Sequence, residues 1–421
     1  MKKGIYTFSR FAFVFILFAI LFSYAMFQGG FVSWFLFFSF LPIIIYSIVM
    51  LFYPLNLVQV HRTVSSKHLR AGQTVKVNVT IRRKMPFPLL FVVIEDQLPS
   101  TMDYEDSREK KFAYLSNPSL LKKQSIHKTI LFPMFKREIV YEYELPAVPR
   151  GRHHLQEVKV VTGDLLGLVR KEYDFHILTE LLVLPQERPL RLKNEISYFE
   201  EGEQTSYVAA VNKTNVVSGV RDYAPGDKVS WIDWKGTAKK QKLLTREFEQ
   251  EKHKDLTIIL NRIKETEKDW LAFEAGIELA LSLVKASVKD HGRVGFVALG
   301  KKREAISIDQ GNVAFDQLTK LLSDIQMEEQ GIFSEMLLKE SLSLSKDRNL
   351  VIITHDLNRN ILKTLHQINY EDIKMSVIFI RSRSDLTVEM KKVIDRLKLN
   401  GINLTWLHED QLTDKRIEVR T

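Results

Sequence analysis

The chain contains no cysteine. Disulfide bonds, thiolate zinc sites and cysteine nucleophiles are therefore excluded. The chain also lacks the motifs G-x-G-x-x-G and G-x-x-x-x-G-K-[ST], whose glycines bring backbone amides close to nucleotide phosphates. A nucleotide site of either kind is thus not expected.

Charged residues are absent from one long stretch, because residues 11–60 contain no Lys, Arg, Asp or Glu. Within it, the apolar segments 11–27 and 31–53 are separated only by Gln-Gly-Gly. A helix needs roughly 20 apolar residues to cross the hydrocarbon core of a bilayer. A signal peptide would require a small-residue cleavage site before the second segment, and none is present there. The first segment is therefore not expected to be a signal peptide. We therefore expect a transmembrane α-hairpin over residues 1–56.

Positive charges flank this expected hairpin on both sides. The flanking cations are Lys2, Lys3 and Arg10 before it and Arg62, Lys67 and Arg70 after it. Because cytoplasmic segments are enriched in Lys and Arg, both termini and the soluble domains are predicted to face the cytoplasm of a multi-pass membrane protein. The net charge of +10 is compatible with anionic lipid, nucleic acid or an acidic protein, and selects none of them.

The first soluble region, residues 57–194, alternates apolar and polar residues with a period of two. The alternation is clearest in 74–83, and similar segments lie at 89–98, 127–135 and 138–148. Prolines separate these segments. Short strands at such spacing predict an antiparallel β-sandwich.

Two motifs lie near the end of this region, Arg-Gly-Arg-His-His-Leu from Arg150 and Gly-Asp-Leu-Leu-Gly-Leu from Gly163. The second predicts a tight turn in which Asp164 accepts hydrogen bonds from the backbone. His153 and His154 are adjacent, so on a strand they point to opposite faces. They cannot share a metal ion and are expected to be structural or solvated.

The last region, residues 255–421, alternates short apolar segments with longer helical patterns. The strand-like segments lie at 256–260, 293–299, 349–354, 375–380 and 403–407. The helical patterns lie at 269–290, 315–325, 360–369 and 386–401. In the first of these, Glu274, Glu278 and Lys285 mark one polar face. The pattern predicts a doubly wound α/β domain with a parallel sheet.

The central segment, residues 195–254, carries the densest mixture of charged and aromatic residues. Pro225 and Gly226 fit the centre of a type II turn. Asp227 then fits the N-cap of a short helix in which Trp231 and Trp234 share one face. Residues 242–251 read as a strand, with Leu244, Arg246 and Phe248 on one side and Thr245 and Glu247 on the other.

Three short motifs in this segment carry a resemblance to a known family. They comprise Arg221, Tyr223, Pro225, Gly226 and Asp227, then Ile232, Asp233, Trp234 and Lys235, and last Arg246, Glu247 and Phe248. With the order of the surrounding regions, the chain resembles the bacterial membrane proteins of domain-of-unknown-function family 58, also called MoxR-associated proteins. The resemblance covers nearly the whole chain, and the last domain of the family is similar to the von Willebrand factor A fold.

The resemblance implies a cytoplasmic platform that works with a MoxR-type AAA+ ATPase in envelope or stress physiology. It implies no catalytic reaction. Von Willebrand A domains that bind Mg²⁺ carry Asp-x-Ser-x-Ser after their first strand. Here the corresponding positions are Asn261, Ile263 and Glu265, and Asp356 corresponds to a later acidic ligand. Because a divalent ion needs several oxygen ligands, this degenerate site is not expected to hold a metal.

The central segment admits several functional interpretations. Its opposite charges are Arg221, Asp222, Asp227, Asp233, Arg246 and Glu247. As a buried ion-pair network they would brace the fold, and removing Asp233 would then cost about 3–5 kcal/mol. As a docking face, the segment would use Lys235, Lys239, Lys240 and Lys242 at its edge. Catalysis by Asp233 has less support, because no serine–histidine–carboxylate set is evident in this segment. Stacking of nucleic acid on Trp231 and Trp234 would need exposed rings along a basic groove, whereas tryptophans in so short a motif are more often buried.

Together these patterns predict a membrane-anchored, non-enzymatic adaptor or scaffold without a cofactor, which binds protein partners and no nucleic acid. The alternative is a divalent-metal-dependent binder or enzyme that uses the loops around Asn261–Glu265 and Asp356.

Overall fold

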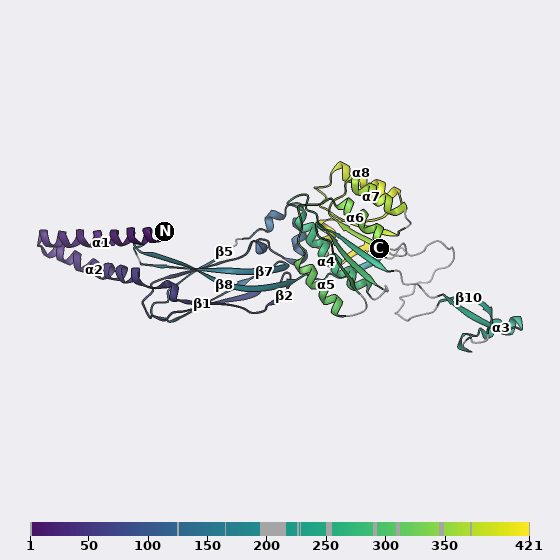
Figure 1. The fold of residues 1–421 in the computed structure, drawn as a ribbon, viewed down its shortest axis with the longest axis horizontal. Coiled ribbons are helices and arrows are strands. Elements are labelled where there is room, and N and C mark those ends of the chain that lie inside the picture. The colour runs from purple at the N-terminus through teal and green to yellow at the C-terminus, as the bar shows by residue number, and fades with distance from the viewer. Residues whose placement is uncertain are drawn as a thin grey trace.

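The computed structural model describes residues 2–123, 126–164, 166–193, 216–224, 227, 229–249, 255–288, 293–308, 312–344, 349–370 and 373–420. The protein is a mixed α/β structure with several sheets and long apolar helices at its N-terminus. In Figure 1 the helices α1 and α2 lie at one end of the strands β1, β7 and β8, and the helices α4 and α5 lie at the other end.

The N-terminal helices are α1 (Lys2–Gln28) and α2 (Phe31–Phe52), which lie side by side (Figure 1). Gly29 allows the sharp turn between them, because its φ of +62° is unfavourable for residues with a side chain. Phe37 of α2 packs against Phe18 of α1, with ring centroids 5.9 Å apart. Among the described residues, α2 is long and apolar enough to cross a membrane, whereas the apolar part of α1, Ala12–Gln28, is shorter.

Two sheets follow the helices, as the alternating patterns predict. The smaller sheet has the order β1 (Gln59–Val64), β3 (Val75–Arg82) and β6 (Glu138–Leu145). The larger has the order β2 (His68–Arg70), β8 (Arg170–Leu184), β7 (Gly151–Gly163), β4 (Val92–Gln97) and β5 (Ile126–Leu131). All pairs are antiparallel except β2 with β8, which departs from the predicted antiparallel arrangement.

The inner faces of the two sheets share one hydrophobic core, the arrangement of a β-sandwich. Val77 and Val79 of β3 belong to the same buried cluster as Ile94 of β4 and Val160 of β7. The 3₁₀ helix η1 (Leu55–Leu57) lies between α2 and β1. The 3₁₀ helices η2 (Ser100–Met102), η3 (Arg108–Tyr114) and η4 (Pro118–Leu121) lie between β4 and β5. Arg62 lies inside the sandwich and pairs with Asp96 at 2.7 Å. It is therefore not one of the cations that flank the N-terminal apolar helices, contrary to its use in the charge pattern.

The predicted turn and histidine arrangement are both confirmed. Asp164 accepts a hydrogen bond from the backbone N–H of Val169 at 3.1 Å and another from the hydroxyl of Ser47 in α2 at 2.6 Å. The turn thus also attaches α2 to the sandwich. His153 is buried and His154 is exposed, as expected of neighbours on a strand.

The C-terminal part contains a six-stranded sheet in the order β14-β13-β12-β15-β16-β17. Its strands are β12 (Leu256–Asn261), β13 (Val294–Leu299), β14 (Glu304–Ile308), β15 (Asn349–Thr354), β16 (Met375–Ile380) and β17 (Asn403–Leu407). The five strand-like segments pair in parallel, as predicted, and β14 adds an antiparallel edge.

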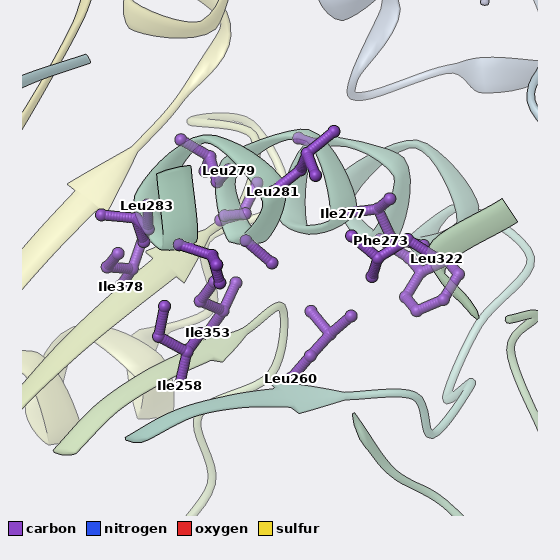
Figure 2. Close-up of a cluster of buried hydrophobic side chains, with 14 of the residues drawn as sticks. Ile258, Leu260, Phe273, Ile277, Leu279, Leu281, Leu283, Leu322, Ile353 and Ile378 are labelled. Atoms are coloured by element: carbon purple, nitrogen blue, oxygen red, sulfur yellow. The ribbon is translucent and has the colours of Figure 1, made fainter. Parts of the chain in front are cut away.

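Helices cover both faces of this sheet. On one face lie α4 (Asp269–Ser287) and α5 (Asn312–Asp324), and on the other lie α6 (Phe333–Ser343), α7 (Arg359–Tyr370) and α8 (Val388–Leu399). Figure 2 shows Ile258 and Leu260 pointing toward α4, whereas their neighbour Ile259 belongs to the core on the opposite face. The nearly continuous apolar pattern of β12 therefore reflects burial on both faces.

The last strand of the C-terminal part lies beside the segment that follows the sandwich. The short helix α9 (Glu409–Thr413) precedes β18 (Ile417–Arg420), which pairs in parallel with β9 (Leu190–Lys193). This pairing ties the C-terminal segment to the segment that follows the sandwich.

Candidate functional site

The segment with the three motifs forms a small unit of its own, which we call the signature module. It consists of β10 (Val216–Asp222), η5 (Val229–Trp231), α3 (Trp234–Lys240) and β11 (Leu244–Glu249). The strand β11 is confirmed, and β10 pairs with it in antiparallel fashion. The sequence reasoning missed β10, although the β-branched residues Val216, Val217 and Val220 were a weak signal.

Arg221 and Asp227 hold the turn of the module. Both terminal nitrogens of Arg221 donate to the carboxylate of Asp227, at 2.9 and 2.8 Å. The backbone N–H of Ala224 donates to the same carboxylate at 3.0 Å, and these bonds, led by those from Arg221, lower the pKa of Asp227. Asp227 therefore closes the turn and is not the N-cap of a helix. The turn residues Pro225 and Gly226 lie outside the described part.

The two tryptophans do not share one helical face. Trp231 lies in η5 and is half-buried, whereas α3 begins at Trp234, which is 62% exposed. Asp233 stands between them, and its backbone N–H donates to the carbonyl of Leu244 at 2.8 Å. This contact to β11 interrupts the helix predicted over 228–234, so the single-helix interpretation is wrong.

The interior of the module is small and mostly apolar. Ile232, Leu244 and Thr245 are buried, and Ile232 forms a backbone bridge with Thr245. The ion pairs lie at its surface instead. Arg246 and Asp233 are 3.6 Å apart, and the side chains of Arg221 and Arg246 are 42% and 47% exposed. These arginines and aspartates therefore do not form a buried network that braces the module. Glu247 and Phe248 belong to β11, and their side chains lie outside the described part.

The surface of the module combines apolar and cationic side chains. The exposed apolar residues are Val220, Tyr223, Val229, Trp234 and Leu243. The exposed cations are Lys235, Lys239, Lys240 and Lys242. Because tryptophan is frequent at the centres of protein interfaces, an exposed Trp234 beside lysines is suited to contact an acidic partner with an apolar pocket.

The carboxyl ends of β12 and β15 form the second candidate site, because ligands of open α/β sheets bind where the strand order reverses. Here, Asn261 donates to the hydroxyl of Thr354 at 3.1 Å and accepts from the backbone N–H of Ile263 at 2.9 Å. Ile263 is buried and offers no ligand atom from its side chain. Asn261 and Ile263 therefore stabilise the conformation of the loop and do not bind a ligand through their side chains.

A buried ion pair lies at the same edge of the sheet. Arg381, which follows β16, donates to the buried carboxylate of Asp269 at 2.6 Å. Asp269 also accepts from the backbone N–H groups of Glu265 and Thr266, at 3.0 and 2.6 Å. The cavity beside Arg381 has a volume of about 10 Å³, room for about one water molecule. The charge of Asp269 is thus neutralised by Arg381, and little space is left beside the pair.

Asp356 is the remaining acidic candidate. It accepts from the side-chain amide of Asn358 at 2.8 Å, and burial, with the nearby charge of Glu265, raises its pKa. The neighbouring His355 is bound through its ring nitrogen Nε2 to the carbonyl oxygen of Ile263 at 2.7 Å, and burial lowers its pKa. In the described ranges no three His, Asp or Glu side chains come together as metal ligands. The residues present do not fit the divalent ion of metal-binding von Willebrand A domains.

A third polar cluster was not anticipated and joins the sandwich to the α/β unit. Glu274 and Glu278 of α4 are buried, although the sequence pattern placed them on a polar face. Arg150 binds Glu274 through two hydrogen bonds of 3.0 and 2.6 Å, and Lys111 binds both Glu278 and Asp106 at 2.7 and 2.6 Å. The polar face of α4 therefore lies against the sandwich.

Burial and charge act in opposite directions in this third cluster. Burial alone would raise the pKa of Glu274, but the guanidinium of Arg150, together with the charges of Lys111 and His153, more than offsets it and lowers that pKa. For Glu278, burial prevails and raises the pKa to about 7. Arg150 also donates to the carbonyls of Ser323 and Ile325 at the end of α5. The cluster holds the sandwich against α4 and α5.

Comparison with known proteins identifies the region that contains the signature module. A family model described as "Protein of unknown function DUF58" matches residues 219–392. The uncharacterized protein YeaD of Bacillus subtilis (strain 168) is 36% identical over 305 residues, which are 72% of this chain and 72% of that protein.

Two solved structures share smaller parts with this chain. Proximal thread matrix protein 1 from the mussel byssus is 12% identical, with a TM-score of 0.28, over 38% of this chain and 45% of that one. A fragment of α2-macroglobulin from Escherichia coli is 15% identical, with a TM-score of 0.21, over 31% of this chain and 24% of that one. This chain thus spans under half of either protein, and both scores are too low to support a conclusion.

Proposed function

Because this chain belongs to the DUF58 family, whose description assigns no activity, we propose that it is a membrane-anchored, non-enzymatic adaptor. It recruits a partner protein through the signature module. The observation that carries the proposal is the exposed Trp234 on a small module that also exposes four lysines, while its Arg and Asp side chains pair with one another.

The anchor in this proposal is a transmembrane hairpin made of α1 and α2. The length and apolar composition of α2 support it, as does the contact of α1 with α2 through Phe18 and Phe37. Cations at Lys2, Lys3 and Arg10 favour a cytoplasmic N-terminus. With an even number of spans, the sandwich and the α/β unit are also cytoplasmic.

The α/β unit in this proposal is a von Willebrand A-like domain that works without a metal. Its parallel sheet, antiparallel edge strand and helices on both faces support the likeness in architecture. The contact of Arg381 with Asp269 supports a role without a divalent ion, since a guanidinium already neutralises this carboxylate. The domain then serves as a binding platform.

The partner in this proposal is a MoxR-type AAA+ ATPase in envelope or stress physiology. An acidic surface with an apolar pocket on that ATPase would complement Trp234 and its lysines. The partner is named from the resemblance of the three motifs, and the chemistry of the module supports an acidic protein. We expect Trp234 to supply most of the affinity and the lysines to raise the association rate at low salt.

Co-purification tests this function. The tagged full-length protein is extracted in mild detergent, with and without a non-hydrolysable ATP analogue, and the retained proteins are identified. The double variant Trp234→Ala/Lys235→Glu should lose the ATPase. The matched control is Leu342→Ala/Lys339→Glu on α6, because Leu342 is 61% exposed, nearly as much as Trp234 at 62%. This control should retain the ATPase.

Two results would oppose the proposal. Absence of any AAA+ ATPase in both nucleotide states would remove the partner. Equal loss of the ATPase in both double variants would show that binding depends on exposed apolar and cationic side chains in general and not on the signature module. Circular dichroism of each variant establishes that it is folded before either conclusion is drawn.

A further inference from the structure

Two loops of the sandwich, residues 83–89 and 132–137, come together as one unit that we call the loop tip. The buried guanidinium of Arg83 donates to the carbonyls of Phe87 at 2.8 Å, Met134 at 3.0 Å and Lys136 at 3.0 Å. Leu89 and Met134 exchange two backbone hydrogen bonds of 3.0 and 2.9 Å. The relative position of the two loops is therefore held by one buried guanidinium and by a pair of backbone hydrogen bonds.

The loop tip lies directly beside α2. The hydroxyl of Tyr46 donates to the carbonyl of Pro88 at 2.9 Å, and the ring of Tyr46 stacks on Phe87 with centroids 5.4 Å apart. Tyr53 contacts the same ring at 5.5 Å. Tyr46 precedes the end of α2, Phe52, by about 9 Å at a rise of about 1.5 Å per residue. The loop tip thus reaches alongside the last turns of α2.

The outer surface of the loop tip is apolar and cationic. Phe132 and Phe135 are 72% and 64% exposed, and Met85 and Met134 are exposed as well. Lys84, Lys136 and Arg137 are exposed between them. Residues 83–89 and 132–137 include no Asp or Glu. Large apolar side chains gathered with cations, and without acids, are typical of surfaces that contact anionic lipid.

We propose that the loop tip docks on the lipid bilayer that α2 crosses. Phe132, Phe135 and Met134 enter the boundary between headgroups and acyl chains, and the cations contact lipid phosphates. The inference rests on the proposed membrane crossing of α2 and adds a second attachment. Since Arg83 and Tyr46 fix the loop tip to the sandwich and to α2, docking determines how the sandwich is oriented on the membrane.

The absence of cysteine makes a direct test possible. The full-length protein carrying Phe135→Cys is labelled with an environment-sensitive fluorophore in vesicles of phosphatidylcholine and phosphatidylglycerol. Doxyl-labelled phosphatidylcholine then serves as the quencher. The emission should shift to shorter wavelength, and most of its intensity should be lost to the quencher. Met85→Cys repeats the measurement from the other loop, so a local folding defect at one position does not decide the result.

Two further positions serve as controls. Phe38→Cys on α2, 59% exposed in the protein, reports whether α2 lies in the bilayer. Leu120→Cys, 66% exposed, is a matched apolar position in η4, beside Leu121 of the core around α4. If the probe at 38 is quenched while those at 135 and 85 behave like the probe at 120, the docking proposal is overturned and the anchor stands. If the probe at 38 is not quenched either, the anchor itself fails.

The cationic part of the proposal has its own test. In vesicles that contain phosphatidylglycerol, Lys84→Glu/Lys136→Glu should weaken the quenching at 135. In vesicles of phosphatidylcholine alone, the same double variant should leave it unchanged. Equal quenching of parent and variant in both lipids would show that the cations do not contact lipid phosphates.

Discussion

Single side chains in this protein differ most in how far their charges are buried. Arg62 and Asp96 are fully buried in the sandwich, and the hydroxyl of Tyr143 donates to the same carboxylate at 2.6 Å. By contrast, Arg221 and Arg246 of the signature module are nearly half exposed. The cost of removing one partner depends on this difference, because a buried charge left alone has no solvent to stabilise it.

Asp96→Ala should therefore lower the free energy of unfolding by about 3–5 kcal/mol, since Arg62 loses its partner in the core. Urea unfolding followed by circular dichroism measures the change. The control is Glu138→Ala, whose partner Arg82 and own side chain are both more than half exposed. That control should change stability by no more than about 1 kcal/mol. Equal effects would contradict the assignment of Asp96 to a buried pair.

Asp233→Ala should cost no more than about 1 kcal/mol, because its pair with Arg246 is 3.6 Å long and open to solvent. This replaces the larger loss expected from the sequence, which assumed burial. Unfolding of the signature module, followed by hydrogen exchange of β11, is the measurement. A loss of several kcal/mol would restore the bracing role. Binding of the proposed ATPase partner, measured in parallel, separates docking from stability.

His153 should make stability depend on pH. Burial lowers its pKa to about 4, from 6.5 in the unfolded chain. Between these values the unfolded chain binds more protons, so the stability contributed by neutral His153 falls as pH falls from about 6.5 to about 4. The full shift corresponds to about 3 kcal/mol. Urea unfolding of the parent and His153→Gln should show their difference shrink over this window, and a constant difference would contradict the prediction.

At the scale of secondary-structure elements, β7 connects the two folded units. The φ of Gly151 is +140°, which residues with a side chain rarely adopt. Its neighbour Arg150 reaches Glu274 of α4 and the last carbonyls of α5, while Arg152 pairs with Asp324 at 3.0 Å. The Arg-Gly-Arg motif is thus the contact between the sandwich and the helices of the α/β unit.

Arg150→Lys should weaken this contact, because a lysine cannot donate two parallel hydrogen bonds to Glu274 and also bind the end of α5. We expect a loss of about 3 kcal/mol and faster hydrogen exchange in the last turn of α5. Lys285→Arg, at a partly exposed position on the same helix as Glu274, is the control and should leave exchange unchanged. Unaltered exchange in Arg150→Lys would show that α5 does not depend on this arginine.

The loop after β12 should not bind divalent cations with saturation. Asn261 and Asp269 are engaged by Thr354 and Arg381, and Ile263 offers no oxygen from its side chain. Calorimetric titration of the full-length protein with Mg²⁺, Mn²⁺ and Ca²⁺ should give only dilution heats. Tight saturable binding that Asp356→Asn abolishes would favour the metal-dependent alternative instead.

At the scale of the whole molecule, the apolar helices, the sandwich and the α/β unit follow one another in space as in the sequence (Figure 1). Neighbouring units are joined by shared apolar clusters and by buried polar contacts, from Ser47 to Asp164 at one end and from Arg150 to Glu274 at the other. An orientation imposed on the helices by a membrane would therefore be transmitted through the sandwich.

Single cysteines test the proposed orientation, since the parent has none. In spheroplasts, a membrane-impermeant maleimide should label Gly29→Cys between α1 and α2. It should not label Lys301→Cys, which is exposed in the α/β unit. Labelling of both after permeabilisation is the control for reactivity. The reverse pattern would place the soluble units outside the cytoplasm and exclude a cytoplasmic ATPase as the partner.

The sequence by itself determined what depends on neighbours along the chain. Apolar length marked α2, a period of two marked β3, and fully apolar segments marked the parallel strands. Each pattern records which faces of a local element are buried. Only the tertiary structure decided the environment of the charges. Glu274 meets Arg150 across 124 positions, Arg62 meets Asp96 inside the sandwich, and Trp234 stays exposed. A side chain's burial and partners depend on how distant elements pack, and no local period encodes that packing.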